Sequence, residues 1–82
     1  MIDVLFFAGL RETLGDGTAL AWRAGLTVRE LVAALAQREG AKWQQALQDE
    51  QVMVAVNQEV RDADAVLDDG DEVAFFPPVT GG

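Results

Sequence analysis

The chain has 82 residues, of which half are hydrophobic, and carries a net charge of −8 with neither cysteine nor histidine. This length suits one small domain with a modest core. The missing residue types exclude disulfides, thiolate nucleophiles and Cys-ligated iron–sulfur clusters, and they remove the commonest general base and metal ligand. The acidic balance makes nucleic acid and anionic membranes poor partners. The composition therefore argues against a conventional enzyme, and we expect no metal and no bound cofactor.

The N-terminus predicts neither a secretory signal nor a membrane span. Met1-Ile2-Asp3 places no basic residue before the apolar run. That run, Val4–Leu10, is far shorter than the roughly 20 residues that cross a bilayer. We therefore expect a cytoplasmic protein.

The first third of the chain predicts a β-hairpin. Ile2–Ala8 is apolar, β-branched and aromatic on both faces, which predicts a central strand. Gly9–Gly15 predicts a helical turn that stops at its last glycine. The Asp16-Gly17 turn signal then leads into a second strand, Thr18–Trp22, which pairs with the first.

A helix follows the hairpin, and its start is marked by a capping box, Thr27-Val28-Arg29-Glu30. The Thr27 hydroxyl is placed to accept from the Glu30 amide, and the Glu30 carboxylate to reach back to the Thr27 amide. Apolar residues then recur at helical spacing as far as Leu35, and Gly40 is the expected stop.

The rest of the chain predicts a short helix, two paired strands and a last strand. These are a helix around Trp43–Leu47, a strand at Val52–Val56, an edge strand begun by Glu59-Val60 after the Asn57-Gln58 turn, and a strand at Val73–Phe76 after the Asp68–Asp71 turn. Pro77 and Pro78 end the last strand, because neither residue can donate to a ladder.

This order predicts an α+β fold in which one mixed sheet grips one main helix, which is the β-grasp or ubiquitin-like arrangement. We expect residues 1–76 to form this domain and residues 77–82 to form a flexible C-terminal tail. The strand order does not follow from the pattern, and another mixed α+β sheet remains an alternative.

The two-sided strands predict an apolar patch. Side chains alternate across a strand, so Phe7 opposes Phe6, and Phe76 opposes Phe75. One set packs under the helix, and the other lies on the open face of the sheet. Exposed patches of this kind mark partner interfaces, and the candidates are Phe7, Phe76 and Val60. The alternative is that the short helices cover these residues.

Acidic residues gather at Asp68, Asp69, Asp71 and Glu72. Their spacing completes no calcium-binding loop. The Asp-Gly chemistry instead indicates a solvated turn, and we predict no metal site here.

The C-terminal tail carries the clearest functional signal. Two prolines bias the backbone toward polyproline geometry, and the four residues after them reach roughly 13 Å at about 3.3 Å per residue. Gly81 and Gly82 have no Cβ, so they fit a channel too narrow for side chains and leave the terminal carboxylate uncrowded. Adenylation would give that carboxylate a good leaving group. A persulfide nucleophile followed by reductive cleavage would then leave a thiocarboxylate. The alternative is a frayed glycine end.

Three segments of the sequence resemble a known family. They are the C-terminal stretch Asp69–Gly82 with its Phe-Phe-Pro-Pro, the start Val4–Ala8 with Arg11-Glu12, and Ala55–Gln58. They are similar to the small subunit of molybdopterin synthase, a ubiquitin-like sulfur carrier in molybdenum cofactor biosynthesis.

The resemblance implies a chemical role. An E1-like adenylating enzyme would use ATP to activate Gly82, and a sulfur donor protein would convert it to a thiocarboxylate. The tail, Val79, Thr80 and Gly81 included, would enter the large synthase subunit and give its sulfur to cyclic pyranopterin monophosphate. Two carriers would serve one large-subunit dimer as a heterotetramer, and the carrier alone would not be catalytic.

The resemblance also implies an apolar docking surface formed by Phe7, Val60 and Phe76, with Arg11 as a polar contact. The family often has a longer aliphatic residue where Val60 stands, so contact there would be smaller.

Two other functions remain open. A thiamine-pathway sulfur carrier also ends in Gly-Gly, although such carriers generally lack the Phe-Phe-Pro-Pro stalk. A ubiquitin-like protein modifier or interaction module would instead join Gly82 to a lysine through an isopeptide bond.

Overall fold

A computed structural model describes residues 1–77. Its strands form one five-stranded sheet in the order β2-β1-β5-β3-β4. β1 and β5 are parallel, and the other neighbouring strands are antiparallel. In chain order the elements are β1 (Ile2–Phe6), α1 (Ala8–Leu14), β2 (Gly17–Leu20), α2 (Val28–Glu39), α3 (Ala41–Leu47), β3 (Met53–Val56), β4 (Glu59–Arg61) and β5 (Glu72–Phe76).

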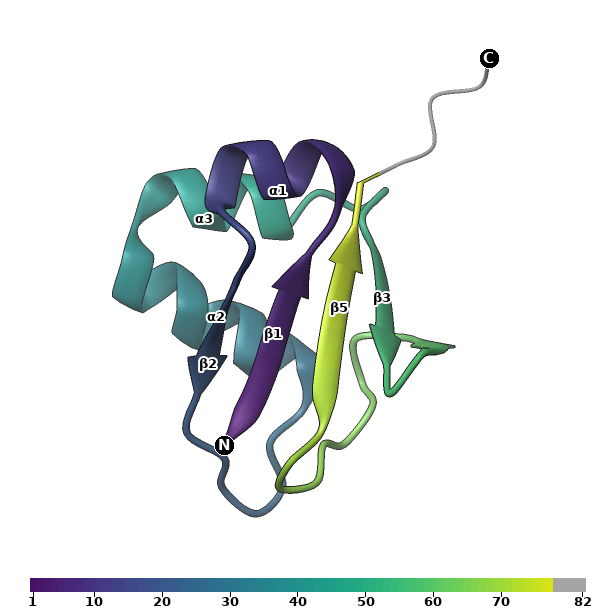
Figure 1. Cartoon of the computed structure of the whole chain (residues 1–82). Helices are drawn as coiled ribbons and strands as arrows, with labels where there is room; N and C mark the ends of the chain where they lie inside the picture. Colours follow the sequence, from purple (N-terminus) through teal and green to yellow (C-terminus); the bar gives the residue numbers. More distant parts are fainter. Residues whose placement is uncertain (78–82) are drawn as a thin grey trace.

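The helices are distributed unevenly around the sheet. In Figure 1, α2 crosses one face, and α1 lies over the end at which β1 and β5 finish. The other face of the central strands carries no helix in the described part of the chain. This is the predicted β-grasp arrangement, with one mixed sheet gripping one main helix. Within residues 1–77, no helix is both long and apolar enough to span a bilayer.

The core lies between the sheet and α2. Strand alternation sends one side chain in two toward the helix, so β1 and β5 each contribute an aromatic ring, Phe6 and Phe75. Phe6 packs edge-on against Trp43 of α3, with ring centroids 5.1 Å apart. Burying one such ring contributes about 1.5–3 kcal/mol. The innermost residues are Ile2, Val4, Phe6, Leu31, Leu35, Leu67, Val73 and Phe75.

The capping box at the start of α2 is confirmed. The Glu30 amide donates to the Thr27 hydroxyl at 3.2 Å, and the Thr27 amide donates to the Glu30 carboxylate at 3.1 Å. The Thr27 amide, with the Arg23 side chain and the Thr27 hydroxyl, holds the pKa of Glu30 below its ordinary value. The helix stops before Gly40, as predicted; this glycine has a positive φ of 101°.

Strand ends differ from the sequence prediction. The first strand stops at Phe6 rather than Ala8, because Phe7 caps α1 and Ala8 begins that helix with a positive φ of 52°. The second strand ends at Leu20 rather than Trp22. Leu20 pairs with Ile2, which is the first residue of β1, so β1 has no further residue with which Trp22 could pair. The Trp22 indole instead donates to the Leu67 carbonyl at 2.8 Å.

Candidate functional site

The last described strand leads directly to the predicted tail. β5 ends at Phe76, and Pro77 is half-buried. The candidate tail residues Val79, Thr80, Gly81 and Gly82 lie outside the described residues. The described part of the site is therefore the surface around the end of β5.

Two stacked aromatic rings stand at this end of the sheet. The parallel register pairs Phe6 with Phe75, and the Phe7 amide extends the ladder by donating to the Phe75 carbonyl at 3.2 Å. Phe7 and Phe76 thus become neighbours on the open face. Their ring centroids are 4.8 Å apart and the ring planes differ by only 11°. The side chains are 40% and 37% exposed, so the short helices do not cover them.

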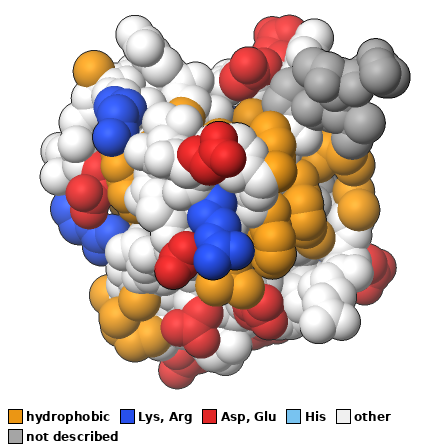
Figure 2. Space-filling model, turned by 45° about the horizontal axis from the view of Figure 1, so that its top comes forward, with side chains coloured by type: hydrophobic (Ala, Val, Ile, Leu, Met, Phe, Trp, Pro, Cys, Tyr) orange, Lys and Arg blue, Asp and Glu red, His pale blue; other side chains and the backbone are white. Residues whose placement is uncertain are grey.

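Cross-strand pairing extends this aromatic pair into a larger apolar surface. Met53 lies opposite Phe76 and is 46% exposed. One row further along the strands, Leu5, Ala74, Ala55 and Val60 are paired in sequence across β1, β5, β3 and β4. Figure 2 shows hydrophobic side chains gathered in the right half of its view. We call these residues the apolar face; its exposed or half-exposed members are Leu5, Phe7, Met53, Val60 and Phe76, and Ala55 and Ala74 are buried between them.

The sequence prediction named three of the seven members of the apolar face, and Met53 is the most exposed of the four that it did not name. Val60 is 65% exposed and lies on β4, two strands away from Phe76. Met53 stands between them, since it pairs with Phe76 on one side and is a diagonal neighbour of Val60 on the other. Strand parity puts Met53 and Ala55 on the same side of β3, but only the pairing of Met53 with Phe76 shows that this side is the open one.

Arg11 is engaged with an acidic residue rather than with the aromatic pair. Its Nε donates to the Asp16 carboxylate at 2.6 Å, and both side chains are more than half exposed. An exposed ion pair of this kind contributes about 0–1 kcal/mol. Arg11 can therefore exchange Asp16 for another acceptor at little cost.

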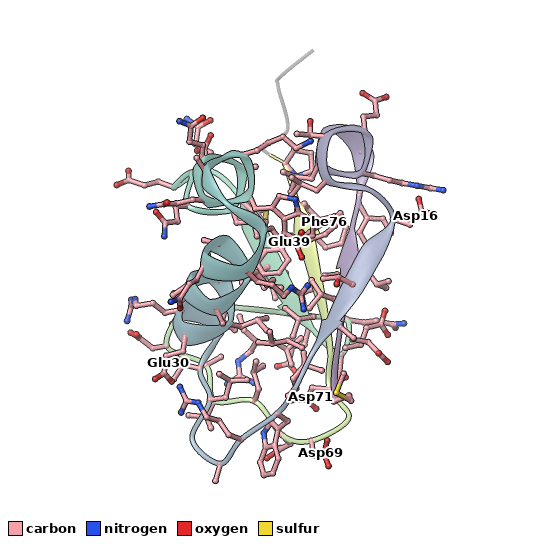
Figure 3. All side chains as sticks on the ribbon, turned by 90° about the vertical axis from the view of Figure 1, so that its left-hand side faces the viewer. Asp16, Glu30, Glu39, Asp69, Asp71 and Phe76 are labelled. Atoms are coloured by element: carbon pink, nitrogen blue, oxygen red, sulfur yellow. The ribbon has the colours of Figure 1, made fainter. Side chains whose placement is uncertain are left out.

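The acidic turn lies at the opposite end of the sheet. Figure 3 shows Asp69 and Asp71 far from Phe76. Asp69 accepts from the N-terminal ammonium at 2.6 Å, and Asp71 accepts from the Asn57 side chain and the Asp68 amide, each at 2.8 Å. These carboxylates thus tie together the N-terminus, the turn after β3 and the start of β5. Residues 1–77 contain no group of three or more acidic side chains arranged to hold a metal ion.

The fold and the apolar face together define a ubiquitin-like β-grasp protein. The model of the ThiS family matches residues 4–82, and the chain belongs to this family. The molybdopterin synthase sulfur carrier subunit of Escherichia coli (strain K12) is 47% identical over 83 residues, with 100% of both chains covered. The resemblance found in the sequence is therefore confirmed.

Solved structures share the fold over nearly the whole chain. SAMP1 from Haloferax volcanii, a small archaeal modifier protein, has a TM-score of 0.78 and 26% identity, covering 99% of this chain and 98% of that one. The Amycolatopsis orientalis BexX/CysO complex contains a chain with a TM-score of 0.72 and 25% identity, with 100% of both chains covered.

Proposed function

We propose that this chain is the sulfur-carrying small subunit of a molybdopterin synthase. The observation that carries the proposal is the 47% identity, over the full length of both chains, to a molybdopterin synthase sulfur carrier subunit. The family match extends to residue 82, so its span covers the Gly81-Gly82 end. The chain would act in the cytoplasm, where ATP is available, and would not be catalytic alone.

The working group would be the terminal carboxylate of Gly82. An E1-like enzyme would join this carboxylate to the α-phosphate of ATP, releasing pyrophosphate. The terminal sulfur of a persulfide on a donor protein would then attack the acyl carbon and release AMP. A thiol reductant would break the resulting acyl disulfide and leave the thiocarboxylate. Attack of that sulfur on cyclic pyranopterin monophosphate would give a thioester between carrier and pterin. Hydrolysis of this thioester by water would leave the sulfur on the pterin and regenerate the Gly82 carboxylate.

The apolar face would dock the carrier on the large subunit. Two stacked aromatic rings, each more than a third exposed, offer rigid contact area beside the start of the tail. One chain of the BexX/CysO complex is a structural neighbour, which supports binding of a partner by this fold. Docking there would direct the tail into the partner, and Arg11 would contribute a polar contact once released from Asp16.

Intact mass spectrometry tests the proposal. The full chain is incubated with ATP, a sulfur source and the adenylating enzyme. We expect a mass increase equal to the replacement of one oxygen by sulfur, mapped to Gly82, and none when ATP is omitted. A variant lacking Gly82 is the matched control and should fold normally but gain no sulfur.

The likeness to SAMP1 makes a protein modifier the second candidate. In that case the same incubation, carried out with a cell extract, would give higher-mass conjugates joined through Gly82 to lysine. Conjugates without any sulfur-bearing carrier would overturn the sulfur-carrier proposal.

A further inference from the structure

The sheet has two outer edges, β2 and β4, and these edges differ in how far other side chains cover their backbone. Arg38 of α2 reaches over the β2 edge. Its Nη1 donates to the Ala19 carbonyl at 2.8 Å and its Nη2 to the Thr18 hydroxyl at 2.7 Å. A side chain that occupies a backbone acceptor in this way blocks pairing with an incoming strand.

The β4 edge has no comparable cover among the described residues. Its three residues are all exposed. Within residues 1–77, neither Glu59 nor Arg61 forms an ion pair or a side-chain hydrogen bond, although each lies next to Val60 on an open edge. An uncovered edge strand is a template for another strand.

The sequence of β4 is complementary to itself. When two copies pair antiparallel about Val60, Glu59 of one copy lies opposite Arg61 of the other, and two-fold symmetry repeats the pair. Opposite charges directly across such a pair attract, whereas like charges repel. The order Glu-Val-Arg therefore favours pairing of β4 with β4 of a second copy, in antiparallel orientation.

The side chains on both faces of β4 can be accommodated in this pairing. Val60 lies opposite Ala55 on the apolar face, so the two Val60 side chains would meet there. Glu59 and Arg61 lie opposite Val56 and Val54, on the side that faces the helix. A groove of about 770 Å³ borders β4 and is lined from both faces, by Arg61, Val54 and Val32 on the helix side and by Val60 and Met53 on the other. It leaves room for the charged side chains of the second copy.

We propose that β4 is a self-association edge, at which two copies of this chain pair antiparallel about Val60 and join their sheets. Three residues form a short ladder, and each copy carries a net charge of −8, so the association is weak and reversible. If the apolar face docks a partner as proposed above, self-association competes with docking because both cover Val60.

Sedimentation equilibrium of the full chain without any partner tests the edge directly, so its outcome is independent of the sulfur chemistry. The series runs from micromolar to millimolar protein at one fixed ionic strength, with wild type, Glu59→Arg, Arg61→Glu and the double swap. We expect self-association of wild type, weakening by about tenfold or more in each single variant, and recovery in the double swap. An equimolar mixture of the two single variants should also associate.

Two controls separate charge order from net charge. Lys42→Glu changes the net charge as much as Arg61→Glu does but lies on α3, and it should leave self-association close to wild type. Glu59→Arg makes the chain less acidic, so overall repulsion falls while the proposed pairs are broken. A wild type that stays monomeric throughout would overturn the proposal. So would single variants that associate like wild type, or a double swap as weak as the single variants.

Discussion

Phe75 and Phe76 are neighbours in β5, yet they belong to different faces of the sheet. Phe75 is 2% exposed and lies under the helices, with its ring centroid 6.0 Å from the ring centroid of Phe6. Phe76 is 37% exposed and stacks on Phe7 on the side where residues 1–77 place no helix. In a sheet covered on one face, strand parity decides whether an aromatic ring stabilises the fold or is left for binding.

Removing each ring in turn should show the largest difference between the two faces of the sheet. Phe75→Ala should lower the free energy of unfolding by about 3–5 kcal/mol, because it leaves a cavity in the core. That is a large share of the 5–15 kcal/mol typical of a native domain. Urea denaturation followed by circular dichroism measures the loss. Phe76→Ala is the matched control and should cost about 1 kcal/mol, as its ring is already partly hydrated. Equal losses would contradict the assignment of the two faces.

Binding should show the reverse order. Phe76→Ala is expected to weaken association with the proposed partner, the large subunit of molybdopterin synthase, by about tenfold or more, since aromatic residues supply much of the energy of an interface. Isothermal titration calorimetry on the folded variant measures this. Phe7→Ala should behave similarly, because it removes the stacking partner. An unchanged affinity in both variants would remove the apolar face from the docking site.

Weakening α2 tests how far the covered face depends on its helix. Thr27→Ala removes the hydroxyl that accepts from the Glu30 amide and should cost about 1 kcal/mol of stability. The apolar face lies on the other side of the sheet, so the affinity per folded molecule should stay at the wild-type value. A Thr27→Ser variant, which keeps the hydroxyl, should recover most of the lost stability in the same urea titration.

The smallest expected effect is a pH dependence at the same cap. The pKa of Glu30 is lowered in the folded state by the Thr27 amide first and by Arg23 second. Ionised Glu30 therefore stabilises the fold above the unfolded-state pKa of about 4.3, and this contribution is lost as the pH falls through the lower folded-state pKa. Glu30→Gln should flatten the stability profile in this acidic range. Profiles that stay parallel from neutral pH to about pH 2 would contradict it.

Much of this comparison could be predicted from the sequence because it depends on local pattern. Alternation placed Phe7 and Phe76 on the open face, and the Thr27-to-Glu30 spacing located the start of α2. The strand order could not be predicted. Insertion of β5 between β1 and β3 is a long-range choice that no local spacing records.

The missed details of the site have the same origin. The exposure of Met53 follows from its pairing with Phe76, which requires the strand order. The resemblance implies a partner contact for Arg11, whereas its ion pair with Asp16 depends on how the chain turns at Gly15 after the end of α1. The predicted tail contacts fall on residues 78–82 and remain predictions.

The central position of β5 has a mechanical consequence. Its residues pair with β1 on one side and with β3 on the other, and the N-terminus lies at the opposite end of the sheet from Phe76 (Figure 1). A pull applied beyond Phe76 along the strand loads both ladders in shear, so many backbone hydrogen bonds must fail together. An edge strand pulled sideways would open one bond at a time. The chain is thus anchored most firmly at the strand that would bear the load when a partner grips or releases its C-terminus.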